Sequence, residues 1–241
     1  MGNRDLSEGY DGHLFNDASL QSALAHEITS PTVLLRQLSL MVADKNTTPD
    51  KMDTLSRQLT LTSDKILRML KTFQYAYDTQ QEIKLETINP MNVCVDVVRE
   101  IKPLFMAQGK KLEIKPRQHS PLLVANYMYL KQILATYLDN ALPYCSAEDP
   151  VYVSVDVIGE KIRIGVRDHG PSVTINVWDE VVDRLGKAAS PVASRPHLSS
   201  VGLAVSHKLA SAMGCDVGHV RHSDGVTFYV EANLSRQMSL V

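Results

Sequence analysis

The stretch HEITSP at residues 26–31 contains the residues best suited to chemistry. Imidazole has an unperturbed pKa of about 6.5, so His26 is a usable nucleophile near neutral pH. The neighbouring carboxylate of Glu27 can accept the proton of one ring nitrogen while the other attacks phosphorus. On a helix Ser30 lies beside His26, at i+4, and Pro31 should kink the helix just after it. The alternative is an ordinary surface histidine, because a His-Glu pair is common on charged helices.

Three further stretches carry candidate ligands for a phosphate compound. Asn140, in the helical run 127–142, offers an amide oxygen suited to Mg²⁺. Asp168 follows an apolar strand and can accept from the exocyclic amine of adenine, and Gly170 permits close backbone approach. Residues 199–205 form a small-residue loop that opens a helix, where backbone N–H groups can hold phosphate. Taken singly, these could be a helix C-cap, a plain turn and a poor phosphate loop.

The first part of the chain should be a helical hairpin. A helix is expected from about Asn16 or Asp17, either of which can act as N-cap. Its apolar positions, at about 100° per residue, fall on one narrow stripe that leaves His26 on the opposite, solvent side. Residues 45–49 interrupt this helix, and a second begins near Asp50. The stripe residues are Leu20, Leu24, Ile28, Leu35, Leu38 and Val42 in the first helix, and Met52, Leu55, Leu59, Thr62, Ile66, Met69 and Phe73 in the second.

The second helix repeats its apolar positions every three or four residues, the spacing of a bundle seam. Two such helices with a short connection pack antiparallel. Each stripe would be better covered if two hairpins packed together, so we expect a homodimer with a four-helix bundle. The alternative is a hairpin that packs on its own C-terminal domain.

The rest of the chain alternates helices and strands. A polar linker that leads into a first strand is expected from Tyr75 to Thr87, followed by helices at 92–107, 127–142 and 202–213. Alternating apolar residues predict strands near 151–157 and 162–166. A further strand is expected at 111–115, a loop at 185–200, and a closing hairpin at 217–232. The fold class is therefore α+β: a hairpin at 16–80 and an α/β sandwich at 85–235, after a flexible segment at 1–15.

Bulk properties exclude several classes of function. The formal net charge is -2, which gives no basic field for nucleic acid. The three cysteines are far apart, without metal-ligand spacing, and are typical of a reducing compartment. No apolar run reaches the roughly 20 residues that span a bilayer, and the N-terminus lacks a signal-peptide pattern. We expect a cytoplasmic protein, attached to a membrane only through a segment not present in this chain.

The order of these stretches, over residues 17–232, resembles that of the H, N, G1 and G2 boxes of two-component sensor histidine kinases. Their ATP-binding fold is similar to that of gyrase, Hsp90 and MutL-type ATPases. The resemblance implies ATP-dependent phosphorylation of His26, assisted by Glu27, and then transfer to an aspartate of a response-regulator receiver domain. Ser30 takes the place of the residue that orients water when such enzymes dephosphorylate their partner.

The resemblance also assigns the nucleotide site. Asn140 would bind Mg²⁺, Asp168 and Gly170 the adenine, and the Gly202 region the phosphates of ATP. Trp178 is similar in place to the aromatic residue that begins the ATP lid.

The sequence departs from the family pattern at several positions of this site. Thr136 and Pro143 replace an asparagine and a lysine of the N box, and Thr136 can still offer an oxygen to Mg²⁺. Ser172 and Ser200 replace glycines of the G1 and G2 boxes. The residues that could return the lost positive charge are Arg184, Lys187, Arg195 and His197.

These losses leave two alternatives to an active kinase. The first is a degenerate dimeric docking or phosphatase module with weak or no use of ATP, which could also keep His26 as a phosphoryl relay. The second is an ATPase of the same fold that acts on other proteins, although such enzymes have no need of an exposed histidine in the hairpin. Asp168 decides between kinase and docking module, because a site that binds no adenine supports no kinase.

Overall fold

The structure, a computed structural model, describes residues 18–44, 47–78, 83–117, 120–173, 195 and 198–235. The side chains of residues 18–24, 26, 73, 76–78 and 200 lie outside the described part, as do Asn16, Asp17, Trp178, Arg184, Lys187 and His197. No helix within these described ranges has the length and apolar character needed to cross a membrane.

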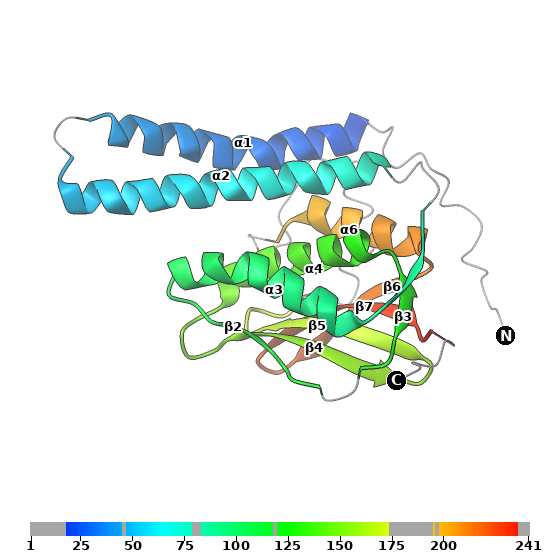
Figure 1. The fold of residues 1–241 in the computed structure, drawn as a ribbon. Coiled ribbons are helices and arrows are strands. Elements are labelled where there is room, and N and C mark those ends of the chain that lie inside the picture. Colours follow the sequence, from blue (N-terminus) through cyan, green and yellow to red (C-terminus); the bar gives the residue numbers. More distant parts are fainter. Residues whose placement is uncertain are drawn as a thin grey trace.

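Two long helices form an antiparallel hairpin, α1 (Ala18–Val42) and α2 (Pro49–Asp78) (Figure 1). All of the expected stripe residues whose side chains are described are at least half-buried. Leu38 and Leu55 are buried, and the others are half-buried. The helix α1 continues through Pro31. The expected start of the linker at Tyr75 is wrong, because α2 continues to Asp78. Tyr75 packs edge-on against Tyr129, with ring centroids 6.0 Å apart, which favours continuation of the helix.

The second part is a five-stranded sheet covered on one face by three helices, α3 (Pro90–Ala107), α4 (Tyr127–Ala141) and α6 (Ser200–Ala212) (Figure 1). The strand order is β2-β4-β5-β7-β6, with β2 parallel to β4 and the other pairs antiparallel. The strands are β2 (Leu112–Ile114), β4 (Val151–Ile158), β5 (Lys161–Asp168), β6 (Asp216–His222) and β7 (Gly225–Asn233).

The strand expected after the linker is β1 (Glu86–Ile88), whereas β3 (Leu123–Ala125) was not expected. The two strands pair antiparallel in a separate two-stranded sheet. With three residues, β3 is too short for its alternation to be recognised from the sequence. After α4 the chain makes a 3-10 turn, η2 (Leu142–Tyr144), with Pro143 in its first turn.

The apolar core lies between the sheet and its helices. It is made of alternate residues of β4, β5 and β7 and of the inner faces of the three helices, among them Val153, Ile162, Ile164, Phe228, Val97, Ile133, Leu134 and Leu209. Asn89, Asn126 and Ser199 cap α3, α4 and α6, each accepting a backbone N–H with its side chain.

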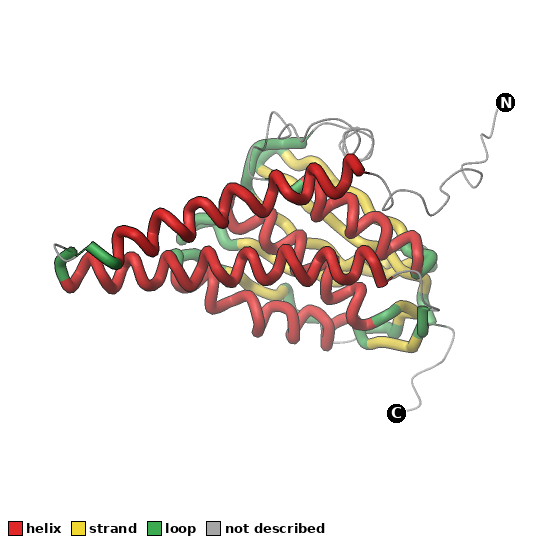
Figure 2. Tube along the Cα trace, turned by 90° about the horizontal axis from the view of Figure 1, so that it is seen from above, coloured by secondary structure: helices red, strands yellow, loops and turns green. Residues whose placement is uncertain are grey.

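The hairpin packs on the helical layer of its own chain. Helix α2 runs over α6 and α4, and α1 reaches α6 (Figures 1 and 2). Seen from above, the loop end of the hairpin extends beyond the sheet and its helices (Figure 2). The packing expected for a hairpin on its own C-terminal part is thus present, while pairing of two hairpins stays a prediction.

Candidate functional site

The first half of the site, the Asp168 end, is built around the carboxylate that closes β5. Asp168 pairs with Val226 of β7 in the sheet register, and only 1% of its surface is exposed. Its Oδ1 accepts the backbone N–H of Gly170 at 2.8 Å, which fixes the turn after the strand. A carboxylate buried this deeply needs further donors, because an unpaired buried charge is very costly.

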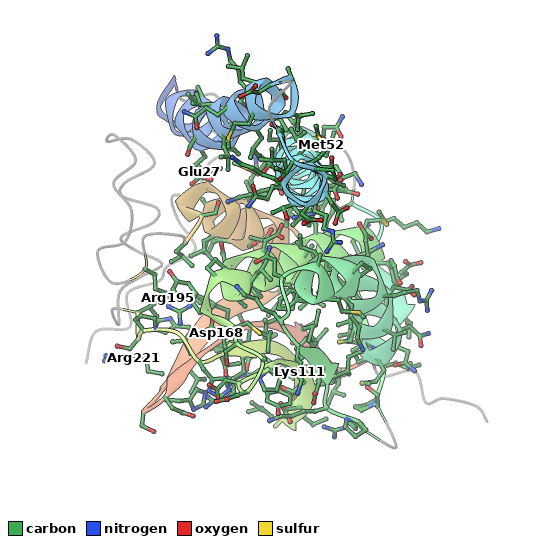
Figure 3. The ribbon with its side chains drawn as sticks, turned by 90° about the vertical axis from the view of Figure 1, so that its left-hand side faces the viewer. Glu27, Met52, Lys111, Asp168, Arg195 and Arg221 are labelled. Atoms are coloured by element: carbon green, nitrogen blue, oxygen red, sulfur yellow. The ribbon has the colours of Figure 1, made fainter. Side chains whose placement is uncertain are left out.

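Arg195 supplies those donors. Its Nη1 donates to Asp168 Oδ2 at 2.8 Å and its Nη2 donates to Oδ1 at 2.6 Å, so that both carboxylate oxygens are engaged. Its Nε donates to the carbonyl of Pro171 at 2.5 Å. The Arg195 side chain is fully buried (Figure 3). This is a two-pronged guanidinium–carboxylate pair, the strong geometry for such contacts.

Aromatic rings flank the guanidinium of Arg195. Its central carbon lies 4.5 Å from the ring centre of Tyr144 and 5.9 Å from that of Phe228. Gly170 closes the third side: a Cβ placed on it would come within 2.6 Å of Tyr144 Cγ and 2.8 Å of Arg195 Nη2. The close approach that this glycine permits is therefore used by the protein's own side chains.

The second half, the α6 end, is the N-terminus of α6. Ser199 Oγ accepts the N–H of Gly202 at 2.8 Å, and Asn140 Oδ1 accepts the N–H of Ser199 at 3.0 Å. Asn140 is 3% exposed, and its Nδ2 has no hydrogen-bond partner among the described residues. The hydroxyl of Thr136 donates to Gln132 within α4, and its methyl group lies 2.8 Å from a Cβ placed on Gly202.

A carboxylate from the hairpin occupies the α6 end. Glu27 Oε2 accepts the hydroxyl of Ser199 at 2.7 Å, and its Oε1 accepts the N–H of Val201 at 3.3 Å. Figure 3 shows Glu27 reaching from α1 toward α6. The unsatisfied N–H groups and the dipole at a helix N-terminus favour an anion.

A second contact ties the hairpin to α4, one residue before Asn140. Arg68 Nε of α2 donates to Asp139 Oδ2 at 2.9 Å and to Oδ1 at 3.1 Å. Desolvation by burial raises the pKa of Asp139, and the charge of Arg68 works against that rise. About two turns earlier on α4, Gln132 Nε2 donates to Thr72 Oγ1 at 2.8 Å.

The predicted site residues thus fall into two groups. Asp168 and Gly170 lie at the first end, and Glu27, Thr136, Asn140 and Gly202 lie at the second. Ser30 is in α1 and exposed. The backbone of His26 lies in α1 next to Glu27, and that of Ser200 begins α6, while both side chains lie outside the described part.

Two functional contacts were missed. We expected Arg195 only as a possible source of charge for phosphates, and the structure puts it on Asp168. No local sequence signal links residues 27 apart in an ion pair. Tyr144 was not singled out at all, because its role depends on the 3-10 turn at Pro143. The cap at Ser199 could have been predicted, since serine just before a helix is a preferred N-cap.

In this arrangement the residues at the Asp168 end do not fit an adenine. Both oxygens of Asp168 carry guanidinium donors, and the space beside Gly170 is filled by Tyr144 and Arg195. At the α6 end the carboxylate of Glu27 takes donors that a phosphate would use, and Asn140 Oδ1 already accepts from Ser199. Binding of Mg²⁺ by Asn140 stays a prediction.

Comparison with known proteins gives this architecture a context. Residues 125–236 match the family model described as Histidine kinase-, DNA gyrase B-, and HSP90-like ATPase. Sensor protein kinase PmrB of Pseudomonas aeruginosa is 23% identical over 223 residues, which cover 90% of this chain and 45% of PmrB. Sensor histidine kinase AruS of the same organism is 26% identical over 148 residues, covering 58% of this chain and 15% of AruS. The chain therefore spans less than half the length of these curated relatives.

Solved structures share the fold at low sequence identity. Acinetobacter baumannii histidine kinase AdeS aligns with a TM-score of 0.56 and 19% identity, covering 88% of this chain and 98% of AdeS. Histidine kinase ThkA in its complex with response regulator protein TrrA aligns with a TM-score of 0.62 and 14% identity, covering 90% of this chain and 62% of that one. The expected fold class, a helical hairpin followed by an α/β sandwich of the ATPase type, is confirmed.

Proposed function

We propose that this chain is the core of a sensor histidine kinase, which phosphorylates itself on His26 from ATP and passes the phosphoryl group to an aspartate of a response regulator. Its residues 125–236 match the model of the histidine kinase, gyrase B and Hsp90-like ATPases. One observation carries the proposal: the turn of α1 that contains His26 is docked, through Glu27, on the N-terminus of α6 in the same chain.

This contact brings the nucleophile's helix to the anion-binding end of the site. Glu27 is the next residue after His26, and its carboxylate reaches the backbone N–H of Val201. The same helix terminus is suited to phosphate oxygens by its N–H groups and dipole. This contact supports a phosphoryl transfer in which the proposed acceptor, on α1, meets the proposed phosphate site at the N-terminus of α6.

The proposed reaction has two steps, phosphorylation of His26 and transfer to the response regulator. A ring nitrogen of His26 would attack the γ-phosphorus of ATP, so that the P–N bond forms as the bond from that phosphorus to the β,γ-bridging oxygen breaks and ADP leaves. The proton of the other ring nitrogen would pass to Glu27. In the second step the P–N bond breaks, and the phosphoryl group joins the receiver aspartate.

The hairpin surface supports the proposed partners. In the single chain Val33, Leu34, Leu40, Met41, Leu67 and Leu70 are large apolar residues of the hairpin that stay exposed. Burial of such residues against a second hairpin would give the homodimer, because contiguous exposed apolar surface marks an interaction site. The exposed Ser30 beside His26 is in place to orient water for dephosphorylation of a bound receiver domain. We assign this activity to the cytoplasm.

A second candidate is favoured by the ion pair of Arg195 and Asp168. If this pair is permanent, adenine has no acceptor, and the chain would act as a dimeric docking or phosphatase module with weak or no use of ATP.

The deciding experiment incubates the purified protein with Mg²⁺ and γ-labelled ATP and scores acid-labile label on the chain. The parent and a His222→Ala control, altered at the exposed end of strand β6, should be labelled, and His26→Ala should not. Label that persists in His26→Ala would refute His26 as the acceptor. No label on the parent at saturating ATP would leave the docking module as the better description.

A further inference from the structure

We propose that Arg195 is a built-in occupant of the base site, which holds the chain in a self-closed state until a nucleotide displaces it. The inference rests on the proposed function in one respect, that the displacing ligand is an adenine nucleotide. It concerns binding, however, and can hold even where no phosphoryl transfer follows.

The first support is the use of both carboxylate oxygens of Asp168. Arg195 donates to both oxygens of Asp168 and to the carbonyl of Pro171. The exocyclic amine of adenine is also a donor, and it would seek the same carboxylate. Guanidinium and amine are therefore competitors for one acceptor, and Arg195 has the advantage of a full charge and a two-pronged geometry.

The second support is the fit of the guanidinium to its surroundings. It is flat, like a nucleobase, and it lies over the ring of Tyr144, with Phe228 farther off on the sheet. Gly170 allows Tyr144 and Arg195 to approach as closely as they do. An arginine held only for stability would need neither the glycine turn nor the ring, since the charge pair alone would satisfy Asp168.

The third support is the position of Arg195 in the chain. Its carbonyl accepts the N–H of Leu198 at 3.0 Å, and Ser199, four residues after it, caps α6 and donates to Glu27. Displacement of Arg195 would therefore disturb its hydrogen bond with Leu198, the residue just before the Ser199 cap. A base that enters at one end can in this way loosen the contact that holds the His26 helix at the other.

The test measures binding of Mg·ADP and Mg·GDP to the full chain by titration calorimetry, for the parent and for Arg195→Met. Methionine fills similar volume without donors, so Asp168 becomes available to the adenine amine. We expect ADP to bind at least tenfold more tightly to Arg195→Met, which is about 1.4 kcal/mol. Guanine has an acceptor at its 6-position where adenine has a donor, so GDP should gain less than about threefold.

A second variant protects the test against misfolding. Arg195→Lys keeps a charge beside Asp168 but lacks the two-pronged geometry, and it should bind ADP more tightly than the parent by a smaller factor. If Arg195→Met fails to give the parent's circular dichroism, Arg195→Lys decides. Unchanged or weaker ADP binding in the folded variants would overturn the proposal, and so would an equal gain for GDP.

The outcome stays separate from that of the kinase test. Tighter ADP binding by Arg195→Met without label on His26 would support Arg195 as the occupant of the base site and reject the proposed kinase activity. Label on the parent together with no gain in ADP binding would support the kinase activity and reject Arg195 as the occupant.

Discussion

The two ends of the site are closed by the protein in different ways. At the Asp168 end a full ion pair is buried, with 0% and 1% of its two side chains exposed. At the α6 end the carboxylate of Glu27 accepts hydrogen bonds from Ser199 and Val201, and Glu27 is only half-buried. At the Asp168 end the guanidinium of Arg195 lies where the amine of a base would bind. At the α6 end the carboxylate of Glu27 lies where a phosphate would bind.

The difference lies in how much each closure resists opening. Water reaches the half-buried Glu27, so its contacts are exchanged for solvation at small cost. The buried pair has no such replacement, and loss of either partner leaves a charge in the core. The α6 end should thus open readily, while the Asp168 end should open only when a ligand takes over the carboxylate.

The largest predicted effect breaks the Asp168 end. Asp168→Ala leaves the guanidinium of Arg195 buried without its carboxylate, and we expect a loss of about 3–5 kcal/mol in the free energy of unfolding. Urea denaturation measures it. Asp224→Ala serves as the control, because Asp224 pairs with Arg167 at an exposed position and its removal should leave the urea midpoint almost unchanged.

A double variant tells whether the loss comes from the unpaired charge. Asp168→Asn with Arg195→Met removes both charges at similar volume, and it should regain most of the stability lost in Asp168→Ala, because a buried ion pair is often replaceable by uncharged groups. A double variant as unstable as Asp168→Ala would mean that the shape of the pair, and not its charge, stabilises this region.

The next effect opens the α6 end. Glu27→Ala removes a charged acceptor from Ser199 and Val201, and we expect a loss of about 1–2 kcal/mol, at the lower part of the range for charged hydrogen bonds. The loss should shrink as salt is added, because exposed charges are screened. The neighbouring exposed Thr29→Ala is the matched control. A loss as large as that in Asp168→Ala would remove the contrast between the two ends.

A smaller effect concerns the cap itself. Ser199→Ala loses the acceptor for the N–H of Gly202, and it should cost about 1 kcal/mol. Ser211→Ala, exposed near the end of the same helix, should have almost no effect on the urea midpoint. Equal midpoints for the two variants would show that the cap contributes nothing measurable.

The sequence predicted most of the helices and strands, for a physical reason. The spacing of apolar residues predicts the hairpin, the strands β4 and β5 and helix α4, because each of these elements has one covered face. The state of the site could not be predicted in this way. The pairing of Asp168 with Arg195 joins distant residues across the sheet and leaves no periodic trace, and the contact of Glu27 with α6 depends on how the hairpin sits on the helical layer.

The smallest effect is a dependence on pH at the second hairpin contact, where Arg68 meets Asp139. Burial raises the pKa of Asp139 above its usual 3.8, so the unfolded chain ionises first as the pH rises. Ionisation then favours unfolding, and this residue's contribution to stability falls as pH increases from near 3.8 through the folded pKa.

Arg68→Met removes the opposing charge and should raise the pKa of Asp139 further. The stability gap between parent and Arg68→Met should therefore widen between pH 4 and pH 7, by up to about 1 kcal/mol. In an Asp139→Asn background the same substitution should give a gap that is constant with pH. A gap that stays constant with pH in the parent background as well would mean that Arg68 does not act through the charge of Asp139.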